Sequence, residues 1–141
     1  MSQQLYNDAI VSTAKANQGA GRLPAATHSA TCDNPLCGDR VTLDLQVEDG
    51  RVGAVAQKTR GCLLTQAAAA VIAAHAAGAT REDLRRVAQE VEALLQGSDD
   101  RPDWPELEMF RPVQAVKSRH DCVLLPFHAV DEAFASPVDR G

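Results

Sequence analysis

The most restrictive feature of the sequence is residues 41–48, where apolar and polar side chains alternate without exception. Asp49-Gly50 follows, and residues 52–57 form a second extended segment. Alternation with a period of two places every second side chain on the same face of a strand. An Asp-Gly pair between two such segments is a strong signal for a β-hairpin. The sequence therefore predicts an antiparallel hairpin with one face in a core and the other in water.

Two helices are predicted directly after this hairpin. Residues 63–77 are rich in alanine, the residue with the highest helix propensity, and Gly78 ends the segment. Thr80 and Asp83 have the spacing of a capping box at the start of the next helix. That helix carries an apolar stripe made of Leu84, Val87, Ala88, Val91, Leu94 and Leu95.

Weaker patterns complete the predicted fold. Residues 3–16 are predicted to form a first helix, and residues 27–32 a short strand. Residues 104–116 are expected to form a short helix, and residues 122–134 a last one that Pro126 perturbs. One helix is followed by a three-stranded antiparallel sheet and then by several helices. This order predicts an α+β fold with a helical half packed on the sheet.

Length and charge narrow the domain organisation and the partners. The 141 residues correspond to one domain over 1–135, and residues 136–141 are expected to fray. The net charge of −5 argues against nucleic-acid binding, which needs a cationic surface. The longest apolar stretch, 67–77, is shorter than the roughly 20 residues of a membrane-spanning helix. The first residues lack a signal-peptide pattern, so we expect a cytoplasmic protein that does not bind membranes.

In the cytoplasm cysteines stay reduced and serve as metal ligands or reactive thiols more often than as disulfides. The four cysteines are Cys32, Cys37, Cys62 and Cys122. Cys37 lies in the loop 34–39, where Pro35 stiffens the chain and Gly38 lets it turn. Cys62 stands at the start of the alanine-rich helix, where unpaired N–H groups favour a thiolate. Cys122 opens the last predicted helix.

Three of these thiols together with Asp39 make a suitable tetrahedral donor set for zinc or iron. Their spacing does not prove such a site, because Cys37 and Cys62 are 25 residues apart and Cys122 follows 60 residues later. The alternative is that Cys62 and Cys122 are small core residues, since free cysteine is commonly buried. Cys32, in a predicted strand, fits the core alternative best.

Three segments carry a resemblance to a known family. Residues 34–39 (NPLCGD), 60–67 (RGCLLTQA) and 119–127 (RHDCVLLPF) resemble the signature segments of the U-type iron–sulfur assembly proteins, which include IscU, SufU and the N-terminal domain of NifU. The chain is most similar to SufU, because Asn-Pro precedes the first of these cysteines and Arg119 stands three residues before Cys122. It departs from IscU, which carries histidine where this chain has Asp121.

The resemblance implies a site made of Cys37, Asp39, Cys62 and Cys122. In SufU-like proteins this site holds zinc and the protein accepts sulfur from a cysteine desulfurase. In IscU-like proteins it assembles a transient [2Fe–2S] cluster for delivery to apo-proteins. The resemblance therefore implies a SufS-like desulfurase and cluster recipients as partners, with Cys37 as the sulfur acceptor. Such a protein acts as a scaffold, a carrier or a zinc-dependent sulfurtransferase.

Two other functions compete with this interpretation. A structural zinc module for protein–protein contacts would have a closed and inert site, which does not explain Asp39 or the glycine beside Cys37. A thiol redox protein would need two close cysteines, and Cys32 with Cys37 is a poor substitute for a Cys-x-x-Cys pair. His120 and Arg119 are candidates for a supporting role near Cys122.

Overall fold

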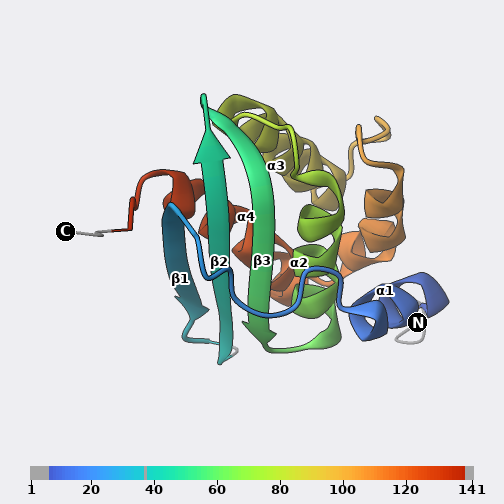
Figure 1. The fold of residues 1–141 in the computed structure, drawn as a ribbon. Coiled ribbons are helices and arrows are strands. Elements are labelled where there is room, and N and C mark those ends of the chain that lie inside the picture. Colours follow the sequence, from blue (N-terminus) through green and yellow to red (C-terminus); the bar gives the residue numbers. More distant parts are fainter. Residues whose placement is uncertain (1–6, 37, 139–141) are drawn as a thin grey trace.

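The computed structural model describes residues 7–36 and 38–138. Its elements are α1 (Asp8–Ala16), β1 (His28–Asn34), β2 (Asp39–Glu48), β3 (Arg51–Arg60), α2 (Leu63–His75), α3 (Arg81–Leu95), the 3₁₀ segments η2 (Pro105–Ala115) and η3 (Lys117–Arg119), and α4 (His120–Phe134). This order of one helix, a three-stranded antiparallel sheet and a helical half confirms the predicted α+β fold (Figure 1).

The sheet has the strand order β1-β2-β3 and is antiparallel throughout. In β2 the apolar residues Val41, Leu43 and Leu45 are fully buried, as the alternation predicted. Asp49 and Gly50 connect β2 to β3 with φ angles of 53° and 77°. Positive φ at both central residues is the geometry of the turn that suits the twist of a hairpin.

Helices cover one face of the sheet. α4 lies against β1 and β2, and α2 lies beside β3, while residues 17–27 cross the opposite face (Figure 1). Ala67–Ala70 of α2 are at most 1% exposed, so their small side chains let neighbouring segments approach closely. A Cβ on Gly19 would lie 2.5 Å from the Cβ of Ala73. This close approach, together with a φ of 76°, requires glycine at position 19.

The structure differs from the predicted helix over 104–116. Residues 105–115 form a 3₁₀ segment instead of an α-helix. Pro112 lies inside it and has no N–H to donate, and its ring clashes with the carbonyl group four residues earlier in an α-helix. Leu107 and Phe110, the two apolar residues that suggested the helix, are fully buried.

Residues 136–138, which the sequence predicts to be frayed, pair with the start of β1. The N–H of Ser29 donates to the carbonyl of Ser136 at 3.1 Å, and the N–H of Val138 donates to the carbonyl of Thr27 at 2.8 Å. Backbone pairing of this kind does not depend on a side-chain pattern, so it could not be predicted from the sequence. Residues 139–141, and residues 3–6 of the predicted first helix, lie outside the described part of the chain.

No helix within residues 7–36 and 38–138 has the length and apolar character needed to cross a membrane.

Asp131 of α4 joins that helix to α3. Arg81 and Arg85 both donate to its carboxylate, at 2.9 and 2.7 Å. The pKa of Asp131 is lowered, mainly by the hydrogen bond from Arg81. Burial acts in the opposite direction, and the hydrogen bond from Arg85 lowers the pKa further. Because the pKa is lower in the folded state, the ion pairs stabilise the fold above the ordinary pKa, and this stabilisation disappears as the pH falls through the folded-state pKa.

Replacing Asp131 with asparagine is therefore expected to lower the free energy of unfolding by about 0.5–1 kcal/mol at pH 7. At a pH well below the ordinary pKa of an aspartate, where the carboxylate is protonated in the native protein as well, the two proteins are expected to be equally stable. Urea titrations across this pH range measure the effect, with the exposed Glu48→Gln as the control. A difference that persists unchanged at pH 2 would contradict the role of the ion pairs.

Candidate metal centre

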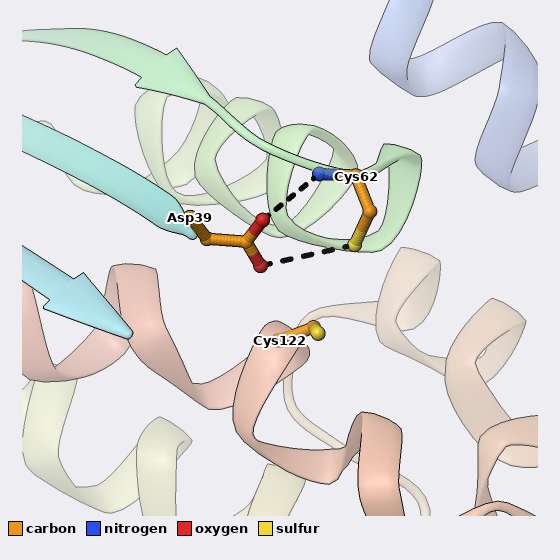
Figure 2. A group of neighbouring side chains, drawn as sticks. All are labelled: Asp39, Cys62 and Cys122. Atoms are coloured by element: carbon orange, nitrogen blue, oxygen red, sulfur yellow. Dashed lines mark hydrogen bonds between the residues drawn. The ribbon is translucent and has the colours of Figure 1, made fainter. Parts of the chain in front are cut away.

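Three of the residues predicted for the site come together at one end of the sheet. One ligand atom from each of Asp39, Cys62 and Cys122 lies within 4.8 Å of the others (Figure 2). Asp39 begins β2, Cys62 is the N-cap of α2, and Cys122 lies in the first turn of α4. Asp39 and Cys122 are buried, with exposed fractions of 3% and 0%, whereas Cys62 is half-buried.

The Asp39 carboxylate is held by donors from α2. The backbone N–H of Cys62 donates to Oδ1 at 3.2 Å, and the hydroxyl of Thr65 donates to Oδ2 at 2.8 Å. The thiol of Cys62 lies 3.9 Å from Oδ2 (Figure 2). A buried carboxylate needs such donors to offset the loss of water. Each carboxylate oxygen has two lone pairs, so Asp39 keeps acceptor capacity for a metal ion.

Gly61 makes this arrangement possible. A Cβ built at position 61 would lie 2.5 Å from Oδ1 and 2.8 Å from Cγ of Asp39. A real Cβ atom does not make contacts this short, so the connection from β3 to α2 can pass this close to the carboxylate only without a side chain. The glycine thus brings the backbone N–H of Cys62 within reach of Asp39.

Cys62 lies at the N-terminus of α2. As the N-cap residue it stands at the positive end of the α2 dipole, near backbone N–H groups that have no partner within the helix. Its Sγ atom lies 3.5 Å from the hydroxyl oxygen of Thr65. Sequence reasoning missed the role of Thr65, a fully buried polar residue of α2. The signal available was its position three residues after Cys62, one helical turn along the chain.

The loop that carries Cys37 is adjacent to this centre. Cys37 itself lies outside the described residues, but Asn34 and Asp39 on either side of the loop are paired across β1 and β2. The Asn34 carbonyl accepts from the N–H of Gly38 at 2.8 Å, and its side-chain oxygen accepts from the N–H of Leu36 at 3.1 Å. Gly38 has a φ of 72°, which favours glycine. Cys37 thus stands in the sequence between Asn34 and Asp39, two residues that are paired in the sheet.

Cys32 is separate from the three converging residues. It is a half-buried residue of β1 that pairs with Val41 and packs against the core. Burial raises the pKa of its thiol, and the carboxylates of Glu132 and Asp33 raise that pKa further. A thiol that resists ionisation is a poor metal ligand and a poor nucleophile.

His120 faces the η2 segment. Its Nε2 lies 3.0 Å from the carbonyl oxygen of Val113, and the group of candidate ligands among the described residues does not include it. Arg119, the other candidate for a supporting role, lies in η3, immediately before α4.

The chemistry of the donor set fits a metal such as zinc. Zinc bonds of about 2.0–2.3 Å place tetrahedral ligand atoms roughly 3.3–3.8 Å apart, and the observed spacing within 4.8 Å approaches this range. Two sulfur atoms and one carboxylate provide soft and hard donors for a borderline metal or for iron. One further ligand completes a tetrahedral set.

Comparison with known proteins establishes the family. The family described as the NifU-like N terminal domain matches residues 5–117. The chain belongs to the NifU-like N-terminal domain family. This finding confirms the resemblance that three short segments indicated.

Members and neighbours of the family agree with this assignment. The iron-sulfur cluster assembly scaffold protein IscU of Thermotoga maritima is 27% identical over 132 residues, covering 93% of both proteins. The zinc-dependent sulfurtransferase SufU of Bacillus subtilis is 25% identical over 105 residues, covering 73% of this chain and 71% of that protein. The crystal structure of a nitrogen-fixing NifU-like protein (N-terminal) from Brucella abortus superposes with a TM-score of 0.87 at 31% identity. The superposition covers 94% of this chain and 93% of the Brucella abortus chain.

Proposed function

We propose that this NifU-like protein assembles iron–sulfur clusters at a site formed by Cys37, Asp39, Cys62 and Cys122. The observation that carries the proposal is the convergence of Asp39, Cys62 and Cys122, from three separate elements, at the end of the sheet where the Cys37 loop begins and ends. The relatives named as a cluster scaffold and as a zinc-dependent sulfurtransferase support the same function. In this proposal Cys37 is the fourth ligand.

Each residue has a distinct role in the proposed site. Cys62 and Cys122 are thiolate ligands from helix N-termini, and zinc bound by them would keep the thiols deprotonated. Asp39 is the hard ligand among soft ones, and the donors from Cys62 and Thr65 stabilise its charge whether or not it binds a metal. A [2Fe–2S] cluster assembled here would be cargo, because the protein must release it to apo-proteins.

The sulfur-transfer step uses Cys37. Its thiolate attacks the outer sulfur of a persulfide on the partner desulfurase, a new S–S bond forms on Cys37, and the desulfurase cysteine leaves as a thiolate. The step is an exchange of sulfur between two thiolates, so it needs no added oxidant or reductant. Cys32 is unsuited to this step because burial raises the pKa of its thiol.

The same proposal includes a SufS-like cysteine desulfurase as sulfur donor, apo-proteins as recipients and a cytoplasmic location.

The alternative of a purely structural zinc module predicts a closed site. Two features argue against a closed site, since Cys62 is half-buried and Leu36, beside Cys37 in the loop, is 90% exposed.

Mass spectrometry after alkylation tests the sulfur acceptor. The chain is incubated with a cysteine desulfurase and L-cysteine, its thiols are trapped with an alkylating tag, and the peptides are weighed. We expect one additional sulfur on the peptide that contains Cys37 and none on the Cys32 peptide. Cys37→Ser is expected to receive no sulfur, whereas Cys32→Ser is expected to receive as much as the wild type. Extra sulfur found on Cys62 or Cys122 would refute the assignment of Cys37.

A further inference from the structure

A basic groove lies on the face of the sheet that the helices leave uncovered. Its volume is about 250 Å³. We call it the basic groove, and it is lined by Arg22, Thr31, Arg40, Thr42, Lys58 and Arg60. Within the described residues no carboxylate lines it. The whole chain has a net charge of −5, so this concentration of positive charge is local.

The charges of the groove are only partly neutralised. Arg22 binds the carboxylate of the buried Asp44 at 2.6 Å, and Arg40 binds Asp33 at 2.7 Å. Burial alone would raise the pKa of Asp44, but the hydrogen bond from Arg22 and other donors hold that pKa below its ordinary value.

Lys58 and Arg60 form no ion pair with any described residue, and both are exposed. The groove therefore keeps two cationic groups available for a ligand.

The strand register places like charges opposite one another. Arg40 pairs directly with Arg60 across β2 and β3, and Lys58 follows on the same face, opposite Thr42. Like charges at directly opposed positions destabilise a sheet. The fold gains no stability from placing Arg40 opposite Arg60, whereas an anionic ligand bound beside them would offset their repulsion.

The groove lies at the same end of the sheet as the metal centre. Arg40 follows Asp39 in β2, and Arg60 precedes Gly61 and Cys62. The ligands of the centre lie toward the helices and the groove lies on the open face, so a partner at this edge of the sheet would contact both. Opposite charges steer the encounter of two proteins and fix its orientation.

We propose that the basic groove binds an acidic segment of the cysteine desulfurase and thereby orients its persulfide toward the Cys37 loop. The identity of this partner rests on the proposed function. Two threonine hydroxyls, Thr31 and Thr42, stand beside the cations and bond to each other at 2.8 Å. They supply neutral donors for carboxylate oxygens that bind in the groove.

Charge reversal in the groove tests this proposal. The variant Lys58→Glu/Arg60→Glu is compared with Lys15→Glu/Arg101→Glu, which changes the net charge equally at exposed positions on α1 and in the loop before η2. The measurement is the initial rate of persulfide formation on the chain as its concentration is varied, with a SufS-like desulfurase and L-cysteine. The rates are recorded at low and at high salt.

The groove variant is expected to raise KM at least about tenfold and to leave kcat within about twofold, because steering changes encounter and not the chemical step. The matched control is expected to keep KM within about twofold of the wild type. Added salt should raise KM for the wild type and have little effect on the groove variant.

Three results would overturn the proposal. An unchanged KM in the groove variant, with normal sulfur transfer, refutes the groove as the docking surface and leaves the proposed function intact. An equal rise of KM in the control shows that net charge, not the groove, governs the encounter. If the wild-type chain receives no sulfur at any concentration, the proposed function fails, and this partner fails with it.

Discussion

Replacing Gly61 with alanine is expected to weaken zinc binding by about 10- to 100-fold, the usual effect of disturbing groups that position a metal ligand. The added Cβ would lie 2.5 Å from Oδ1 of Asp39. The carboxylate has little room to move because it is 3% exposed and is held by the hydroxyl of Thr65. The backbone of residues 61 and 62 must therefore shift, and the sulfur of Cys62 shifts with it.

Competition with a chromophoric chelator measures this loss of zinc affinity. Gly53→Ala is the matched control, because a Cβ there meets the carbonyl oxygen of Gln46 at 3.5 Å, an ordinary contact in β3. The control is expected to bind zinc as the wild type does. Wild-type affinity in Gly61→Ala would mean that the close approach at Gly61 does not position the ligands.

Replacing Cys122 with serine is expected to have a still larger effect on zinc affinity. Structural zinc sites with four ligands bind with about 10–16 kcal/mol, so the loss of one thiolate costs roughly 3 kcal/mol, or about a hundredfold or more in affinity. Serine is close to cysteine in size, so the fully buried position at the start of α4 keeps its packing.

Cys32→Ser separates the metal site from a general effect of losing a cysteine. Cys32 is half-buried and its pKa is raised by burial, so this variant is expected to retain wild-type zinc affinity. The same chelator titration serves both variants, and circular dichroism verifies that each one is folded. A loss of affinity in Cys32→Ser equal to that in Cys122→Ser would place Cys32 among the ligands and contradict the proposed site.

Local patterns predicted the regular elements well. The alternation over residues 41–48 and the Asp49-Gly50 pair led to the hairpin that the structure contains. Thr80 and Asp83 form the capping box expected from their spacing, with both reciprocal hydrogen bonds present. These features are determined by residues close together in the chain, so a single sequence is enough to indicate them.

The ends of the strands were harder to predict. The strands extend to Asn34, Asp39 and Arg60, where the side chains are polar and alternation gives no signal. Backbone pairing continues there because the strands already lie side by side. The extension matters for function, since it carries Asp39 to the end of the sheet where α2 and α4 begin.

The site itself depends on tertiary contacts. Asp39, Cys62 and Cys122 are far apart in the sequence, and only the packing of α2 and α4 against the sheet brings them within 4.8 Å. Motif resemblance named these residues without placing them. The hydrogen bond from Thr65 to Asp39 and the close approach of Gly61 to Asp39 also join residues far apart in the sequence, so they too follow from the tertiary packing.

Native mass spectrometry under anaerobic conditions tests the central proposal most directly, because it weighs metal and sulfide on the intact chain together. The chain is measured as purified and after incubation with a cysteine desulfurase, L-cysteine and ferrous iron. We predict one zinc per chain, or two irons with two sulfides, and the loss of either species in Cys122→Ser but not in Cys32→Ser. A wild-type chain that carries neither metal nor sulfide after this incubation would contradict iron–sulfur assembly at this site.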